Sequence, residues 1–326
     1  MVTKHRTEVT SSELASIRLF STLKKPALEH IAKLVEIKKL AAGHQVYGPR
    51  DVRDRLIIVR SGSLLISKMV GGEELILSTF GAGDFLGEEI IFHPGGHHHY
   101  QIKTYDQPTE IMELSVINFS KLLQQFPDSG QDIQQQIIAT LNYRLQRTDE
   151  KLAVIYGLGK LMSEELTSDT LEAILKIISH NRRCAKALIA SFDPTSRHIL
   201  VEKSLGYRPV LDNKPYSLTS DTVLSLIYHS RKPLRLEPST MERQFRSVQY
   251  MSETFLAVPL PVGNDVVGAL VCAEKLERGV FDHNDEIFLA SVGKMIAPAV
   301  RALQHQKMAR NQAYLRRDFI DSLSRA

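Results

Sequence analysis

Between residues 35 and 114 the chain is a succession of short apolar runs separated by glycine-bearing turns, and this pattern restricts the possible folds most. Residues 56–59 and 63–66 are two such runs, and residues 81–84 form one of the turns. Short apolar runs bounded by turn residues predict β-strands. Many short strands joined by glycine-rich turns predict a β-sandwich or a small barrel.

A helical period follows over residues 132–166. Its apolar positions, spaced mostly by three or four, are Ile133, Ile137, Leu141, Leu145, Leu152, Ile155, Leu158 and Met162. This spacing predicts one long helix, or two with a kink near Gly157 and Gly159, with an apolar seam along one side. The seam either packs against the chain's own barrel or pairs with a second copy, and the sequence leaves both open.

The remainder of the chain predicts an α+β domain. The expected elements are a helix from 169, strands at 185–192 and 198–201, a helix at 220–229, strands at 254–260 and 266–273, and a closing helix from 284 to about 308, continuing toward 319. The last two strands are joined at 263–265 as a hairpin. This order predicts an antiparallel sheet.

Length and composition restrict the function classes. A chain of 326 residues has room for about two domains, and 43% apolar with 24% charged residues is the balance of a folded protein. The net charge of +4 is spread thinly, so we expect no nucleic acid partner. Cys184 and Cys272 form no disulfide or zinc pattern. A polar start and the absence of a long apolar run predict a cytoplasmic protein with no membrane partner.

Several glycine-centred pieces occur in a fixed order in the first half. They are residues 19–23, Gly43, Gly48 with Asp51, residues 56–64 and residues 81–89. With these pieces, residues 15–150 resemble the cyclic-nucleotide-binding domain of catabolite-activator-type regulators, protein kinase A regulatory subunits and cyclic-nucleotide-gated channels. The resemblance implies an N-terminal jelly-roll β-barrel with flanking helices.

The resemblance also implies a ligand site. In that family a short helix and its preceding turn aim N–H groups at a cyclic phosphate, an arginine neutralises the phosphate, and a Gly-Glu pair meets the ribose. Gly87 and Glu88 match the pair, with Phe85 and Glu89 beside them. The family's arginine is absent: the chain reads His97-His98-His99 there, and His97 or His98 stands at its place.

Three interpretations of the histidine cluster stay open. It is a weak phosphate site, or a metal or haem site in which His97 and His99 share a metal, or a polar loop on a barrel that has lost nucleotide binding. Histidine carries full charge only below a pKa near 6.5. Glu88 itself either meets a ribose or caps its own turn. The candidate ligands are cAMP and cGMP, and no cofactor is required.

Four further pieces carry a second resemblance, at 186–193, 204–207, 255–260 and 266–271. With them, residues 151–310 resemble a GAF domain, which implies a C-terminal antiparallel sheet with helices on one face and a small-molecule pocket or dimer surface on the other. Residues 311–326 form a helical extension. The pocket candidates by position are Phe192, Tyr207, Arg243, Phe245 and Tyr250.

Together these features predict an intracellular signal sensor that binds a small ligand and passes the signal, through the long helix and a homodimer rearrangement, to an unidentified protein partner. Two alternatives remain. A transcription regulator of the catabolite-activator type needs a helix-turn-helix, and none is evident after Lys151. A regulatory portion of a larger signalling enzyme is the other. The chain holds no P-loop, GxSxG, HExxH or kinase motif, so we expect it not to be an enzyme.

Overall fold

The computed structural model of the protein forms two compact units, Met1–Arg147 (unit 1) and Thr148–Ala326 (unit 2). The structure describes residues 9–91, 95–163, 167–193, 195–208, 215–218, 221, 223–241, 245, 248–277 and 279–324, without the side chains of 91 and 310–324. The α+β architecture of the chain confirms the predicted fold class.

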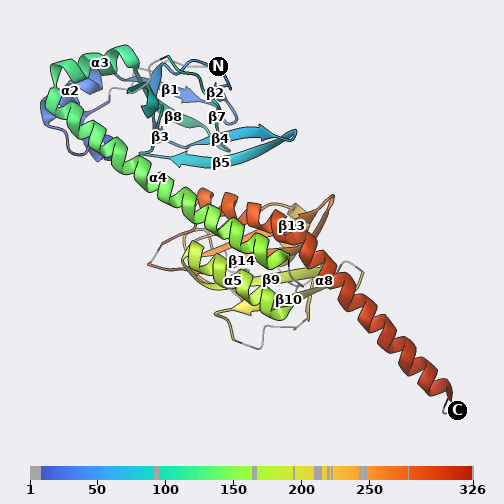
Figure 1. Cartoon of the computed structure of the whole chain (residues 1–326). Helices are drawn as coiled ribbons and strands as arrows, with labels where there is room; N and C mark the ends of the chain where they lie inside the picture. Colours follow the sequence, from blue (N-terminus) through green and yellow to red (C-terminus); the bar gives the residue numbers. More distant parts are fainter. Residues whose placement is uncertain are drawn as a thin grey trace. The chain divides into compact units, whose positions relative to one another are not determined.

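Unit 1 is built on two four-stranded antiparallel sheets (Figure 1). One has the order β1-β8-β3-β6 and the other β2-β7-β4-β5. The strands are β1 (Glu36–Leu40), β2 (Gln45–Tyr47), β3 (Arg55–Ser61), β4 (Ser63–Val70), β5 (Glu73–Gly81), β6 (Phe85–Leu86), β7 (Gln101–Thr104) and β8 (Thr109–Ser115).

Strand β3 shows why this region reads as short apolar runs. Leu56 and Ile58 point into one core, whereas Ile57 and Val59 point into a second core on the other side of the strand. A strand that is buried on both faces must be continuously apolar. This central strand therefore holds the unit together from both sides.

Short helices cover the first of these cores. They are α1 (Ser11–Ser16), η1 (Arg18–Phe20), α2 (Lys25–Leu34) and α3 (Val116–Gln125), followed by the start of α4 (Pro127–Met162). Phe20, Ile31, Phe119 and Ile133 are almost fully buried there. A further short helix, η2 (Glu88–Ile91), follows β6.

Helix α4 is continuous from Pro127 to Met162, so the alternative of two helices with a kink at Gly157 and Gly159 is not realised. The predicted seam divides between two faces. Ile133, Ile137 and Leu158 are buried in the cores of their own units. The second set stays exposed and consists of Leu141, Leu145, Leu152 and Ile155, together with Ile138.

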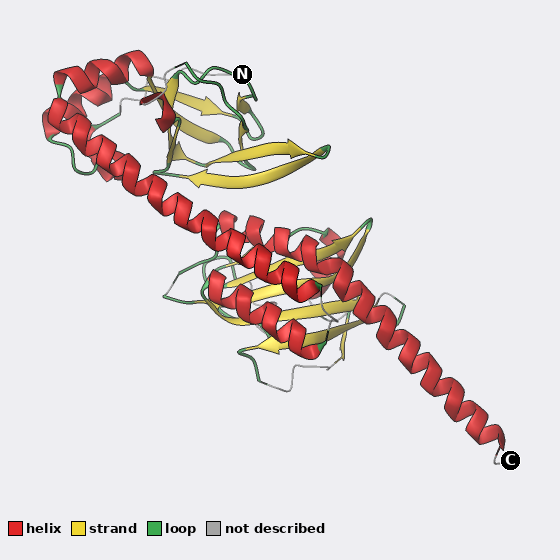
Figure 2. Cartoon of the chain, viewed as in Figure 1, coloured by secondary structure: helices red, strands yellow, loops and turns green. Residues whose placement is uncertain are grey.

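Unit 2 contains one six-stranded antiparallel sheet, ordered β11-β10-β9-β14-β13-β12. Its strands are β9 (Cys184–Asp193), β10 (His198–Leu205), β11 (Pro215–Ser217), β12 (Leu234–Leu236), β13 (Phe255–Val262) and β14 (Asp265–Lys275). The end of α4, α5 (Ser168–Arg182) and α8 (His283–Ser324) pack on one face, as Figure 2 shows, and α6 (Leu224–Ser230) packs on the other. The expected helix at 220–229 begins later, because Asp221 caps it by accepting from the backbone amides of Val223 and Leu224.

None of the helices in the described part of the chain has the length and apolar character required to cross a membrane.

Candidate functional site

The turn between β6 and η2 in unit 1 has a backbone that only glycine adopts easily. Gly87 has a φ of +82°. A Cβ atom there would lie 2.5 Å from the carbonyl oxygen of Arg55, at the start of β3. The close approach of β3 therefore gives a structural reason for a glycine at this position. The tight turn places Glu88 at the beginning of η2.

Glu88 is buried, and its partner is an arginine from α4. The Nη1 atom of Arg144 lies 3.0 Å from Oε1 of Glu88, and Nη2 donates to the carbonyl of Phe85 at 2.6 Å. The guanidinium carbon lies 4.8 Å from the ring centre of Phe80 and 5.0 Å from that of Phe85. Cation–π attraction therefore adds to the ion pair. Burial raises the pKa of Glu88, while the charge of Arg144 opposes that rise.

The sequence analysis did not identify Arg144 as a candidate site residue. Arg144 lies 56 residues from Glu88 in the chain, on a helix that was predicted from its apolar residues and not from its charges. The turn-capping interpretation of Glu88 accounts for only part of its environment, since the main side-chain contact is made with α4. The carboxylate that the resemblance assigns to a ribose thus already holds one cation.

The histidine cluster runs beside the loop between β2 and β3. Val52 and His97 form an isolated antiparallel bridge, and the amide of His98 donates to the carbonyl of Asp51 at 2.8 Å. The ring of His98 lies 4.2 Å from that of Tyr47 and is half-buried. Burial lowers the pKa of His98. This imidazole is consequently neutral near pH 7 and is a poor substitute for an arginine.

His97 and His99 are exposed, whereas His98 is turned inward, as expected for alternating side chains of an extended segment. The described residues contain no group of three or more His, Cys, Asp or Glu side chains that could hold a metal ion. His93 lies outside the described residues. The metal interpretation of His97 and His99 therefore lacks further ligands in the described part of the chain.

A second arginine that the sequence did not single out lies against this segment. Arg53 Nη1 is 3.3 Å from Oε1 of Glu89, on η2. Its guanidinium covers Gly96, where a Cβ atom would come within 2.5 Å of Nη2. The Nε atom of Arg53 is buried and has no hydrogen-bond partner among the described residues. A buried donor without a partner is costly, and an anion would satisfy it.

In unit 2 the predicted pocket residues lie on the face of the sheet that carries α6. Phe192, Phe245 and Tyr250 are buried in one apolar cluster, and Tyr207 packs against it. Arg243 lies outside the described residues. Three of these four side chains belong to the apolar core of the described part of this face and Tyr207 packs against it, and their role in lining a pocket stays a prediction.

Hydrogen bonds fix two of these aromatic side chains in place. The hydroxyl of Tyr250 lies 2.7 Å from both carboxylate oxygens of Asp221. The hydroxyl of Tyr207 donates to the backbone carbonyl of Tyr250 at 2.9 Å. Burial, followed by the charge of Asp221, raises the pKa of Tyr250 well above its ordinary value. Both tyrosine hydroxyls therefore have hydrogen-bond acceptors within unit 2.

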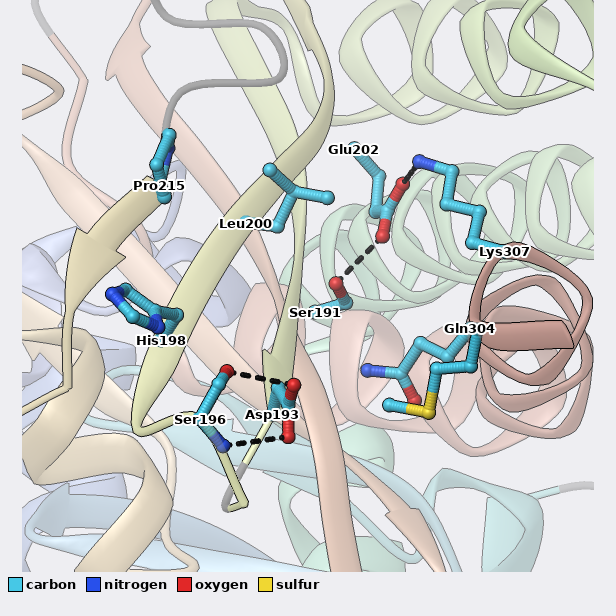
Figure 3. Close-up of a pocket in the computed structure, with 10 residues that line it drawn as sticks. Ser191, Asp193, Ser196, His198, Leu200, Glu202, Pro215, Gln304 and Lys307 are labelled. Carbon is cyan, nitrogen blue, oxygen red and sulfur yellow. Dashed lines mark hydrogen bonds and ion pairs between the residues drawn. The ribbon is translucent and has the colours of Figure 1, made fainter. Parts of the chain in front are cut away.

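A pocket of about 300 Å³ lies on the opposite, helix-covered side of the same sheet. Strands β9, β10 and β11 form its floor and α8 one wall (Figure 3). Phe192, Tyr207, Phe245 and Tyr250, the described residues among the predicted pocket candidates, are not among its lining residues.

Comparisons with known proteins assign both halves of the chain. The family described as the cyclic nucleotide-binding domain matches residues 37–126, and the GAF domain family matches residues 167–300. The "CRP-like cAMP-activated global transcriptional regulator" of Mycobacterium tuberculosis is 28% identical over 142 residues, which are 43% of this chain and 60% of the relative. The "cAMP-activated global transcriptional regulator CRP" of Pasteurella multocida is 30% identical over 129 residues, 39% of this chain and 59% of the relative. The matches thus span about three-fifths of each relative's length.

Solved structures similar to each half are also known. A cyclic nucleotide-binding domain from Methylobacillus flagellatus is 18% identical, with a TM-score of 0.38, and covers 42% of this chain and 78% of its own. The GAF domain from an Acinetobacter phosphoenolpyruvate-protein phosphotransferase is 17% identical, with a TM-score of 0.42, and covers 48% of this chain and 96% of its own.

Proposed function

We propose, for a chain that carries a cyclic nucleotide-binding domain followed by a GAF domain, that it is a regulator which binds a cyclic mononucleotide in unit 1 and signals through α4. The observation that carries the proposal is the contact between Glu88 and Arg144. It joins the turn that would meet the ribose to the helix that leaves the barrel.

The mechanism needs only a ligand that distinguishes two positions of α4. A ribose hydroxyl donating to Glu88 would add a contact to a carboxylate that already holds Arg144. We propose that the affinity of the nucleotide for unit 1 is higher when Arg144 contacts Glu88 than when α4 has moved away from Glu88. Differential affinity of this kind is the whole energy source of the switch.

We further propose that Arg53, rather than His97 or His98, neutralises the cyclic phosphate. Guanidinium groups in general stay charged at every relevant pH, whereas burial lowers the pKa of His98. The unpartnered Nε atom of Arg53 supplies a donor, and the phosphate would compete with Glu89 for the guanidinium. cAMP is the first candidate, because the relatives from M. tuberculosis and P. multocida are both described as cAMP-activated.

The exposed residues of α4 support a homodimer. Ile138, Leu141, Leu145, Leu152 and Ile155 repeat with the spacing of a two-stranded coiled coil, if Thr148 fills the position between Leu145 and Leu152. Exposed apolar side chains on one stripe of a helix gain free energy when a second copy covers them. A second copy of α4 is the occupant that matches the stripe in length and periodicity.

The output of the signal is a separate question. The relatives are described as transcriptional regulators, so they do not support the expectation that this chain has no nucleic acid partner. We propose that the chain regulates without catalysing a reaction and acts through a protein partner. A DNA-binding output is the alternative that those relatives favour.

Titration calorimetry of the full chain with cAMP and cGMP tests the ligand proposal. The matched variants are Arg53→Ala and His98→Ala. Saturable heat that Arg53→Ala abolishes and His98→Ala leaves unchanged is the expected result. The absence of heat with either nucleotide at millimolar concentration would overturn it, and so would loss of binding in His98→Ala alone.

A further inference from the structure

The floor of the pocket in unit 2 is set by the register of β9 and β10. Asp193 is the direct partner of His198, and Ser191 is the direct partner of Leu200. All four line the pocket, so they share one face of the sheet. Asp193 and Leu200 are therefore diagonal neighbours, and such neighbours on one face of an antiparallel pair lie about 7–8 Å apart. A short alkyl chain with a polar end can contact both.

Helix α8 forms the wall above this floor. The side-chain amide nitrogen of Gln304 donates to the backbone carbonyl of Phe192 at 3.2 Å. Phe192 immediately precedes Asp193, so this bond holds α8 next to the Asp193 end of the floor. Met308 follows Gln304 by four residues and lies on the same face of the helix. The apolar surface next to Asp193 thus comes from Leu200 below and Met308 above.

The other end of the pocket is electrically balanced. Glu202 on β10 is buried, with a side chain only 1% exposed. It accepts from the hydroxyl of Ser191 at 2.6 Å and from the ammonium of Lys307 on α8. Figure 3 shows this pair toward one end of the pocket and Asp193 toward the other. Because the charges of Glu202 and Lys307 offset one another, the charge of Asp193 decides which ligands the described lining residues favour.

Asp193 keeps its charge and has room for one more donor. It accepts from the hydroxyl and the amide of Ser196, at 2.7 and 3.2 Å, and from the amide of Thr195 at 2.9 Å. These bonds, that of the Ser196 hydroxyl first, lower the pKa of Asp193, so the carboxylate is ionised near pH 7. An ionised carboxylate has about four acceptor positions, and the three bonds leave one of them for a ligand.

We propose that this pocket binds a small primary amine with a short alkyl body. Its ammonium would donate to Asp193, and its alkyl body would lie on Leu200 and Met308. An anion is disfavoured by the charge of Asp193, and a neutral molecule forms no ion pair there. The volume of about 300 Å³ is at the lower end of the range for small-molecule sites, as a ligand of this size requires.

The inference goes beyond the function proposed above, because the pocket belongs to unit 2 and takes a ligand of another class. It also differs from the site that the GAF resemblance implies, which lies on the other face of the sheet. Asp193 and Leu200 belong to the sheet and Met308 belongs to α8. The amine would therefore contact both sides of the boundary between the sheet and α8.

The test compares three probes of nearly equal size. 3-Methylbutylamine is the cation, 3-methylbutanol its neutral counterpart and 3-methylbutanoate its anionic counterpart. Ligand-observed NMR titration of the full chain at pH 8 is expected to show the amine binding at least about tenfold more tightly than either counterpart. No saturable binding of the amine at millimolar concentration would overturn the proposal. Equal affinity for the amine and the alcohol would overturn it as well, since the pocket would then recognise only the alkyl body.

Two variants place the amine. Asp193→Asn removes the charge but keeps an oxygen that can accept from the turn, and it is expected to weaken amine binding at least about tenfold. Leu200→Phe fills the cavity and is expected to abolish binding. Asp106→Asn, which changes an exposed carboxylate of unit 1, is the matched control and is expected to leave amine binding unchanged. Circular dichroism shows whether each variant is folded, so that either pocket variant decides if the other does not fold. Unchanged amine binding in folded Asp193→Asn or folded Leu200→Phe would contradict the site.

The same variants are titrated with cAMP. Asp193→Asn and Leu200→Phe are expected to leave any cAMP binding unchanged, because the nucleotide would bind in unit 1. Failure of the amine site and failure of the nucleotide site are therefore separate outcomes.

Discussion

The guanidinium of Arg144 lies 3.0 Å from the carboxylate of Glu88 and is flanked by the rings of Phe80 and Phe85. A single residue of α4 thereby contacts both Phe85 and Glu88, on either side of the turn that resembles a ribose site. In the function proposed above, this contact links a ligand of unit 1 to α4, which continues into unit 2.

Replacing Glu88 by Gln is expected to lower both cAMP affinity and stability. The change removes the charged acceptor that Arg144 contacts at 3.0 Å, which costs about 1–3 kcal/mol of unfolding free energy. Urea denaturation and calorimetry measure the two effects. In the double variant Glu88→Gln/Arg144→Met, part of the stability should return, since no unpaired charge remains. Arg147→Met, one turn away on α4 at a half-buried position where the guanidinium contacts Tyr143 instead of Glu88, is the control, and an equal loss there would show that the pair is not special.

Replacing Gly87 by Ala is expected to destabilise unit 1 more than replacing Gly43. Both glycines have positive φ, +82° and +72°, so each alanine pays about 1–2 kcal/mol of backbone strain. Only at Gly87 would the new methyl group also meet a backbone carbonyl, whereas nothing lies within 4 Å at Gly43. Denaturation midpoints of the two variants check the difference. Equal losses would mean that the turn relaxes.

Introducing charge on the exposed stripe of α4 is expected to dissociate the dimer. Leu145→Glu and Leu152→Glu would place carboxylates in an apolar seam, which is strongly unfavourable. Sedimentation equilibrium should then give half the mass of the unmodified protein. Ile117→Glu alters an equally exposed apolar residue on α3 and should leave the mass unchanged. If the unmodified protein itself sediments as a monomer, the proposed homodimer through α4 is wrong.

His98 gives the protein an acid-sensitive contact. Because burial lowers its pKa in the folded state, the unfolded chain binds the proton first as the pH falls. The stability that the neutral ring provides is full above pH 6.5 and is lost below that value, as the pH falls through the lower pKa of the folded state. The variant His98→Phe keeps a ring on Tyr47 but does not titrate. Between pH 7.5 and 5.5 the unmodified protein is expected to lose more stability than this variant in urea denaturation, and a parallel decline would refute the assignment.

Removing the hydroxyl of Tyr250 is expected to destabilise unit 2. Tyr250→Phe leaves the buried carboxylate of Asp221 without one donor, at a cost of about 1–3 kcal/mol. Thermal unfolding measures the change. Tyr156→Phe, at a side chain that is 78% exposed, should be neutral. A neutral Tyr250→Phe would indicate that the aromatic face of the sheet is not packed as described.

Local sequence patterns predicted many of the strands and helices of the fold. The alternation of apolar runs and glycine turns predicted the first sheets, and the hairpin at 263–265 predicted the pairing of β13 with β14. These features depend on neighbours in the chain, where turn chemistry and side-chain period act directly. The short strands β11 and β12, each of three residues, were missed, because so few residues show no period.

The sequence by itself determined two domains, their order, their strand-rich and helix-rich regions, and the turn at Gly87 and Glu88. Only the tertiary structure decided which residues complete the sites. Arg144 and Arg53 reach Glu88 and Glu89 from distant elements, and Lys307 reaches Glu202 across 105 positions of the chain. Contacts between segments that are distant in sequence also bury Phe192 and Tyr250 in the core of unit 2. Contacts between segments far apart in sequence follow from packing, and no local period records them.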